Sequence, residues 1–299
     1  MQLAIKALEL KGEVITTPFT YAATTTALLW ENCKPVFVDI DPTNFCIDPF
    51  KIESKITVNT EAILATHVFG HPCNVKEIEL IAKKHGLKVI YDGAHAFSTQ
   101  IDSGSIFKYG DVSTCSFHAT KLFHTIEGGC IVTNSDELAH QITLYRQFGH
   151  IDDEHFSIGI NGKNSEFHAA MGLCNIKYIA QILKMRQMQW IYYEKQFLSI
   201  KQVKILAIPQ GIDYNCAYFP IVFSSEKKLI QIVKVLNSQD ITPRRYFYPS
   251  LNELPYLQDH QPCPISESIS KSVLCLPLFH KLNKYNQERI VDTILKELI

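Results

Sequence analysis

The sequence predicts an α/β protein: a large domain with a mainly parallel sheet, followed by a smaller α+β domain. Three observations lead to this fold class. Short β-rich runs alternate with helical stretches through the first two-thirds of the chain. Most of these runs are apolar on both faces, as in strands that helices cover on each side. A strand, a helix and a strand also follow one another closely, which favours parallel pairing.

Six runs in this part of the chain are predicted to be strands. They are Glu13–Thr16, Pro35–Ile40, Ala62–Val68, Lys88–Tyr91, Val112–Phe117 and Cys130–Thr133. The clearest helix lies between the third and the fourth run. Asn74 can cap its start, with Glu77 three residues on as in a capping box, and Gly86 can end it. One face of this helix is apolar, through Val75, Ile78, Ile81 and Ala82.

A long helical stretch then connects two domains. It runs from Ser165 to Ile200 and carries the chain from a cofactor-binding domain, residues 1–180, into a small domain, residues 181–299. In the small domain, Ala217–Phe223 is predicted to be a strand and Ser225–Leu236 an amphipathic helix. A loop rich in proline and tyrosine follows that helix.

The composition excludes several classes of partner. The chain has 299 residues, 46% hydrophobic, and a net charge of -1, so no bulk charge attracts it to nucleic acid or anionic lipid. No run approaches the roughly 18 apolar residues of a membrane span, and the start does not resemble a signal peptide. Nine cysteines without a CxxC pair indicate reduced thiols and a cytoplasmic protein.

Three short segments carry the candidate chemistry. The first is Val89–Ala96, in which Asp92 directly follows an apolar run. The second, Ser116–Lys121, is followed by Glu127, Gly128 and Gly129. The third is Gly159–Glu166, which leads into the long helix. Ligands of open α/β sheets bind at the carboxyl ends of the strands, where Asp92 and Lys121 are both expected.

A lysine and a carboxylate on neighbouring strand ends can simply form a structural ion pair. The functional interpretation is a site for pyridoxal phosphate. This cofactor needs an amine that holds its aldehyde as a Schiff base, here Lys121. It also needs an acid that keeps its pyridine nitrogen protonated, here Asp92. Ser116 could then hydrogen-bond the phosphate.

These segments, in this order, resemble the DegT–DnrJ–StrS family of sugar aminotransferases, from about Leu8 to the C-terminus. The run from Ser116 to Gly129 is the most specific part of the resemblance. Further matching segments are Pro18–Thr24, Val36–Pro42, His67–Pro72 and Leu274–Leu278. The resemblance implies an aspartate-aminotransferase-like large domain of fold type I, with a smaller C-terminal α+β domain.

The resemblance also implies a role for each site residue. Lys121 would bind the cofactor covalently and then move the proton during transfer, Asp92 would pair with the pyridine nitrogen, and Ser116 would contact the phosphate. His95 falls where family members contact the ring hydroxyl. Tyr21 falls where an aromatic ring stacks on the cofactor, although a core tyrosine is the alternative.

Asn161 matches a family residue that reaches the cofactor phosphate of the neighbouring subunit. The implied assembly is therefore a homodimer with shared active sites. Some relatives are dehydratases with a histidine in place of the lysine, and Lys121 argues against that reaction here.

The implied reaction transfers an amino group from glutamate to a dTDP-linked 4-keto-6-deoxyhexose, or its 3-keto isomer. Its product would be an amino sugar, for example of lipopolysaccharide O-antigen. Arg244, Arg245 and Tyr246 are the candidates for substrate binding, because guanidinium groups beside aromatic rings suit a sugar diphosphate and a stacked base. The alternative is a pair of solvated charges on a loop. His67, His71 and Cys73 are spaced like metal ligands, but no fourth ligand follows, so no metal site is predicted.

Family members carry some tens of residues before the segment that opens this chain, including a turn whose amides hold the cofactor phosphate. Met1 is therefore expected to lie within the helix that follows this turn. Without the turn, a second hypothesis is a catalytically silent relative, an assembly partner or a decayed gene product. A third hypothesis keeps the cofactor and changes the reaction.

Overall fold

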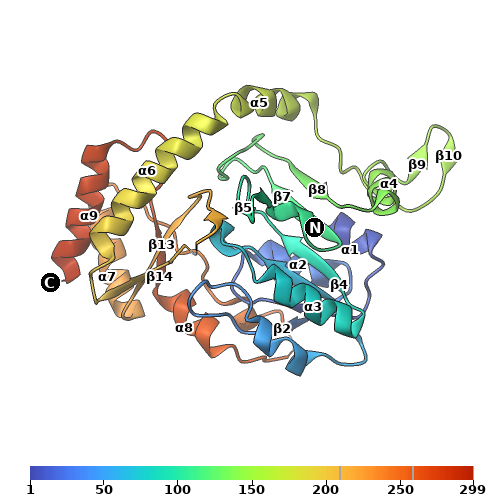
Figure 1. Cartoon of the computed structure of the whole chain (residues 1–299), viewed down its shortest axis with the longest axis horizontal. Helices are drawn as coiled ribbons and strands as arrows, with labels where there is room; N and C mark the ends of the chain where they lie inside the picture. The colour runs from blue at the N-terminus through green and yellow to red at the C-terminus, as the bar shows by residue number, and fades with distance from the viewer. Residues whose placement is uncertain (209, 258, 299) are drawn as a thin grey trace.

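The computed structural model describes residues 1–208, 210–257 and 259–298. Its centre is a six-stranded sheet of the order β2-β1-β3-β4-β7-β8 (Figure 1). The strands are β1 (Glu13–Thr16), β2 (Lys34–Phe37), β3 (Thr60–Thr66), β4 (Lys88–Asp92), β7 (Val112–Ser116) and β8 (Gly129–Val132). All neighbours pair in parallel except β8, which runs antiparallel to β7. The predicted fold class, α/β with a mainly parallel sheet, is confirmed.

Helices cover both faces of this sheet, as the apolar runs predict. Ala62 and Leu64 of β3 pack with helices α1 (Gln2–Ala7) and α2 (Ala22–Trp30). The alternate residues of the same strand, Ile63 and Ala65, pack on the other face with helix α3 (Val75–His85). Strand β3 is therefore buried on two sides, which explains why its sequence does not alternate.

Helix α3 begins and ends as its sequence predicts. The side chain of Asn74 accepts a hydrogen bond from the backbone N–H of Glu77, and Gly86 has a φ of 69°. This left-handed conformation suits glycine and closes the helix. Both signals are local, so they could be found without knowledge of the fold.

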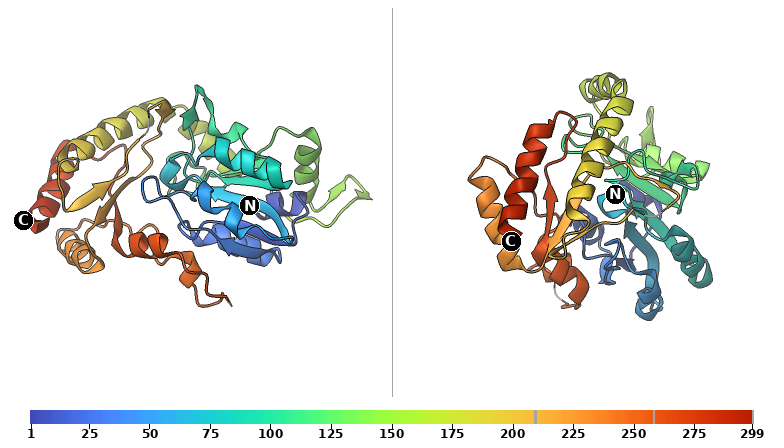
Figure 2. Two further views of the ribbon diagram at one scale, coloured as in Figure 1. Left: turned by 60° about the horizontal axis from the view of Figure 1, so that its bottom comes forward. Right: turned by 60° about the vertical axis from the view of Figure 1, so that its left-hand side comes forward.

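The predicted long helix is two helices, α5 (Glu166–Ile176) and α6 (Ile179–Phe197), with a break at Lys177 and Tyr178. Helix α5 is almost entirely exposed; Gly172 is its one buried residue. It follows an arm that contains helix α4 (Asp136–Tyr145) and the short strands β9 (His150–Ile151) and β10 (Glu154–His155). In Figure 1 and in the left view of Figure 2 the β9–β10 hairpin extends away from the rest of the molecule.

The last hundred residues form a smaller sheet with helices on it. The sheet has the order β11-β13-β14, and its strands are β11 (Val203–Ile205), β13 (Phe219–Phe223) and β14 (Val273–Leu276). Helices α6, α7 (Glu226–Asn237) and α9 (Lys284–Leu298) supply the rest of its apolar core. Within the described residues, no helix is both long and apolar enough to cross a membrane.

The two parts of the chain are joined at several points besides α6. Strand β12 (Ile212–Asp213) pairs with β5 (Gln100–Ile101), which in turn pairs with β6 (Gly104–Ser105). Near β2, the side chain of Gln261 bonds the backbone of Phe37 and Pro35. Helix α8 (Pro264–Ser272) begins directly beyond this contact, beside the sheet. Five short 3₁₀ turns complete the described structure: Pro49–Lys51, Glu53–Lys55, Val68–Gly70, Ile106–Lys108 and Leu251–Glu253.

Candidate functional site

Asp92 is the last residue of β4, at the carboxyl end of the central sheet, and its side chain is buried. Its carboxylate accepts hydrogen bonds from the Thr24 hydroxyl at 2.7 Å and from the Ala94 N–H at 3.0 Å. Among the residues that the structure describes, no cationic side chain forms an ion pair with it. A buried carboxylate held by neutral donors alone still attracts a cation.

Lys121 lies in the loop between β7 and β8, and it lines the same cavity as Asp92. This cavity has a volume of about 1030 Å³, which is ample for a small-molecule ligand. Burial lowers the pKa of the Lys121 ammonium, the charge of Asp92 raises it, and the cation of Arg244 lowers it further. The sum lies below the usual lysine value, so more of this side chain is neutral amine at a given pH.

His95 is buried on the wall of this cavity. Its Nδ1 accepts the backbone N–H of Phe69 at 3.2 Å, and its ring stacks on Phe247 at 5.6 Å between centroids. Burial first, and then the charge of Lys121, hold the pKa of His95 well below its ordinary value. The ring is therefore neutral, and since Nδ1 is an acceptor, its proton is on Nε2.

Ser116 and Tyr21 also line the cavity, from two different elements. Ser116 ends β7, and its hydroxyl accepts the backbone N–H of His118 at 3.3 Å. Tyr21 is the residue before helix α2 and is 61% exposed. It is not a core tyrosine, because more than half of its surface is accessible.

Asn161 does not lie with the other predicted residues. It is exposed, its side chain accepts the N–H of Lys163, and it is not among the residues that line the cavity. Its neighbour Gly162 does line the cavity. The chain therefore contacts the cavity at Gly162. The side chain of Asn161 is exposed to solvent, so another molecule could contact it.

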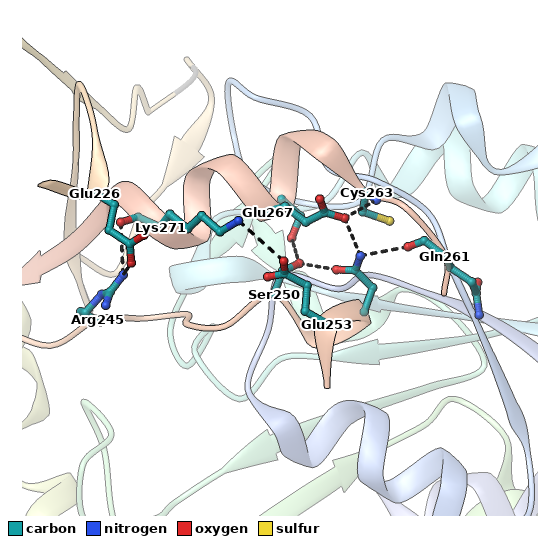
Figure 3. A network of polar contacts seen from close by, with 10 residues as sticks. Glu226, Arg245, Ser250, Glu253, Gln261, Cys263, Glu267 and Lys271 are labelled. Atoms are coloured by element: carbon teal, nitrogen blue, oxygen red, sulfur yellow. Dashed lines mark hydrogen bonds and ion pairs between the residues drawn. The ribbon is translucent and has the colours of Figure 1, made fainter. Parts of the chain in front are cut away.

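The two adjacent arginines have different environments. Arg244 lines the cavity together with Tyr246, and its guanidinium donates to the Tyr246 hydroxyl at 2.6 Å. Arg245 lines neither this cavity nor the second one described below. It pairs with Glu226 at 2.9 Å, in the polar network that extends along helix α8 (Figure 3). The structure therefore does not bring Arg245 to the site. Its guanidinium forms an ion pair with Glu226 of helix α7 instead.

A second cavity of about 820 Å³ lies on the other side of the Lys121 loop, between helix α6 and the end of β14. Lys121, Arg244 and Tyr246 line both cavities. Arg186 of α6 lines the second one, and sequence reasoning missed it because it looks like an ordinary charged residue in a long helix. Thr24, the hydroxyl partner of Asp92, was missed for a similar reason: its contact joins residues far apart in the sequence.

The possible metal ligands have other partners. Nδ1 of His67 accepts the backbone N–H of Cys73, and the His67 ring stacks on Tyr91. Within residues 1–208, 210–257 and 259–298, no three His, Cys, Asp or Glu side chains are grouped as a metal site would need.

The chain matches the DegT/DnrJ/EryC1/StrS aminotransferase family over residues 1–295. It is 43% identical over 298 residues to a dTDP-4-amino-4,6-dideoxy-D-glucose transaminase of Shigella dysenteriae. That alignment covers 97% of this chain and 81% of the Shigella protein.

Solved structures agree with this match. The crystal structure of DesI in the presence of its TDP-sugar product is similar, with a TM-score of 0.93 and 31% identity, covering 99% of this chain and 78% of DesI. NtdA from Bacillus subtilis, solved with the bound cofactor PMP, gives a TM-score of 0.91 at 27% identity, covering 99% and 70%. The fold is therefore that of fold type I aminotransferases. The chain belongs to the DegT/DnrJ/EryC1/StrS aminotransferase family, and it is an aminotransferase.

Proposed function

We propose that this chain uses pyridoxal phosphate bound at Lys121 to transfer an amino group from glutamate to a dTDP-linked 4-keto-6-deoxyhexose. One observation carries the proposal. Lys121 and Asp92 are opposite charges on the wall of one cavity, and the carboxylate has no cationic partner in the described structure. A cationic ring nitrogen between them would satisfy the carboxylate, while the neutral amine of Lys121 would react with an aldehyde.

The remaining lining residues fit the same cofactor. Ser116 offers a hydroxyl, and the buried hydroxyl of Thr66 on the cavity wall has no hydrogen-bond partner in the described structure. His95, neutral with its proton on Nε2, can donate to a ring oxygen. Tyr21 offers an exposed aromatic face. Each of these groups remains available, as a site built for a polar aromatic ligand requires.

When bound, pyridoxal phosphate supplies an electron sink for the carbon that carries the amino group. The chain supplies the proton transfers. Lys121 is the basic group of the site, and its pKa, lowered by burial, makes the neutral amine that can take up a proton more available than in an ordinary lysine. Asp92, held by Thr24 and Ala94, stays in place to favour positive charge at the ring nitrogen.

The substrate is proposed from the relatives and from the charge of the site. The Shigella relative is named for a dTDP-linked 4-amino sugar, and DesI was solved with a TDP-sugar product. Arg244 and Tyr246, beside Lys121, suit a phosphorylated sugar. The 3-keto isomer is the alternative substrate, since one relative of 30% identity is named for a 3-amino sugar.

We also propose a homodimer in which Asn161 serves the partner's site. Exposed apolar side chains are concentrated on the arm and on helix α5, which suits a partner surface. They are Phe148, Ile151, Phe156, Ile158, Ile160, Phe167, Leu173, Ile176 and Tyr178. All nine cysteines are unpaired thiols, which supports the cytoplasm as the compartment.

The cofactor proposal is tested by the colour of the purified protein. With pyridoxal phosphate added, we expect visible absorbance that disappears in Lys121→Ala and that remains in the surface control Lys234→Ala. Adding glutamate should change this absorbance and release 2-oxoglutarate. A wild-type protein that stays colourless with added cofactor would instead support the silent relative.

Substrate choice is tested in the second half of the reaction. The protein, first treated with glutamate, is mixed with a dTDP-4-keto-6-deoxyhexose or with its 3-keto isomer. We expect the absorbance to return faster with the 4-keto sugar. Faster return with the 3-keto sugar would reverse the assignment, and return with neither would remove the proposed substrate class.

A further inference from the structure

The second cavity is strongly cationic. Four of its lining residues are permanently or usually cationic, and two histidines lie among them. They are Lys121, Arg186, Arg244 and Lys281, with His124 and His280. Among the described residues that line this cavity, none is acidic. An anion that enters here would meet no like charge.

Arg186 is a cation of this cavity whose guanidinium has only part of its donors bonded in the described structure. Its Nη1 donates to the carbonyl of Ala217 at 2.9 Å, while its Nε is buried and has no hydrogen-bond partner in the described structure. Burial lowers the pKa of its guanidinium, and the groups that raise it again, Tyr218, Cys216 and Tyr214, include no carboxylate. A buried guanidinium without an anion is energetically costly, because five donors need partners and the charge needs compensation.

The cations of this cavity lie close enough together to shift the pKa values of the same neighbouring side chains. Burial first, and then the charges of Lys281 and Arg186, lower the pKa of His280. The pKa of Tyr218 is also influenced by both Arg186 and Arg244. Cationic side chains therefore line this cavity from Lys121 through Arg244 and Arg186 to Lys281, which is exposed, and the exposed His280 ring lies beside them.

We propose that Arg186, with His280 and Lys281, forms an anion-binding subsite that holds a charged group of the substrate while its reacting end lies at Lys121. The inference rests on the proposed function and assigns the residues that would recognise its substrates. Two anions of that reaction share the required chemistry: the diphosphate of the nucleotide sugar and the second carboxylate of the amino donor. Both offer several oxygens to the fork of a guanidinium.

Direct binding measurements test the subsite without turnover. Calorimetric titrations with dTDP, thymidine and 2-oxoglutarate are made on the wild-type protein and on Arg186→Gln, which keeps the length and loses the charge. We expect the dissociation constant of dTDP, of 2-oxoglutarate, or of both to rise at least about tenfold, with thymidine unchanged. Weakening of dTDP alone identifies the diphosphate as the anion, and weakening of 2-oxoglutarate alone identifies the carboxylate.

Three further variants separate loss of the subsite from simple misfolding. Lys281→Gln changes an exposed side chain and should weaken the same anion, while Arg289→Gln on α9 lines neither cavity and should change nothing. Arg186→Lys, which keeps a charge, should restore part of the affinity. The proposal is overturned if wild type binds neither anion, or if Arg186→Gln and Lys281→Gln both bind them as wild type does.

The cofactor colour separates this proposal from the proposed function. Arg186→Gln should keep the absorbance of cofactor at Lys121, because Arg186 does not line the first cavity. A colourless protein whose dTDP affinity still depends on Arg186 would refute the proposed function and leave the subsite standing. A coloured protein whose affinities for dTDP and 2-oxoglutarate do not change in Arg186→Gln would support the cofactor at Lys121 and refute the subsite.

Discussion

At the scale of single residues, the behaviour of Lys121 depends on two neighbours of opposite charge. After burial, which has the largest effect on its pKa, Asp92 raises the value and Arg244 lowers it. The amine reacts with an aldehyde only when it is deprotonated. The rate of cofactor uptake should therefore rise with pH through the pKa of Lys121, and each neighbour should shift that midpoint in a known direction.

We expect Arg244→Gln to shift this midpoint to higher pH. Removal of a nearby cation makes the ammonium easier to keep, so the pKa of Lys121 rises. The adjacent Arg245→Gln is the matched control, since Arg245 pairs with Glu226 and lines neither cavity. The measurement is the rate of absorbance change when cofactor-free protein takes up pyridoxal phosphate, as a function of pH. A midpoint that moves to lower pH in Arg244→Gln, or equally in both variants, contradicts the account.

The sequence alone could predict that Asp92 and Lys121 lie at the same edge of the sheet, because each comes just after a predicted strand and strand ends of a parallel sheet meet at one edge. It could not separate Arg244 from Arg245. Arg244 pairs through its backbone with Cys275 in an isolated β-bridge, and successive residues of an extended chain point to opposite sides. Which side faces the cavity is decided by that pairing, which joins residues 31 positions apart.

At the scale of elements, helix α8 obtains its cap from a distant part of the chain. Its own residue before the first turn, Cys263, makes no side-chain cap hydrogen bond. Instead, the carboxylate of Asp39 accepts the N–H groups of Ile265 and Ser266, each at 2.9 Å, and also that of Ile40. A carboxylate at this end of a helix also compensates the positive pole of the helix dipole.

We expect Asp39→Ala to destabilise the protein by about 2 kcal/mol or more, because it leaves buried N–H groups without an acceptor. Asp292→Ala, an exposed change on helix α9, should have little effect. The free energy of unfolding from urea titrations gives the comparison. Equal stabilities of the two variants would show that Asp39 does not hold α8 in place.

Elements with local signals were predictable, and those set by remote contacts were not. Asn74 and Gly86 define helix α3 within one short segment. The break at Lys177 and Tyr178 has no proline or glycine, so the helical pattern appears continuous from Ser165 to Ile200. The cap of α8 could not be predicted from the sequence either, because Asp39 and Ser266 are 227 residues apart.

At the scale of the whole molecule, helix α5 and the arm expose large apolar side chains to solvent. Phe167 and Ile158 are 88% and 86% exposed, and apolar side chains this open on one face are typical of an interface. The break in the long helix lets α5 turn away from α6 and lie over the Lys121 loop. There, the side-chain amide of Asn175 donates a hydrogen bond to the carbonyl of His124.

We expect Phe167→Asp to separate the proposed homodimer, because a buried unpaired charge opposes association. Leu198→Asp is the matched control: Leu198 is 71% exposed, but it follows α6 in the small domain. Light scattering coupled to size-exclusion chromatography gives the mass of each variant. A wild-type protein that is monomeric, or a Phe167→Asp variant that remains a dimer, would contradict the proposed assembly.

The most direct test of the site as a whole is the identity of the lysine that carries the cofactor. Wild-type protein incubated with pyridoxal phosphate is reduced with borohydride, digested, and mapped by mass spectrometry. We expect a stable pyridoxyl phosphate group on Lys121. Modification of another lysine, or of none, would contradict it.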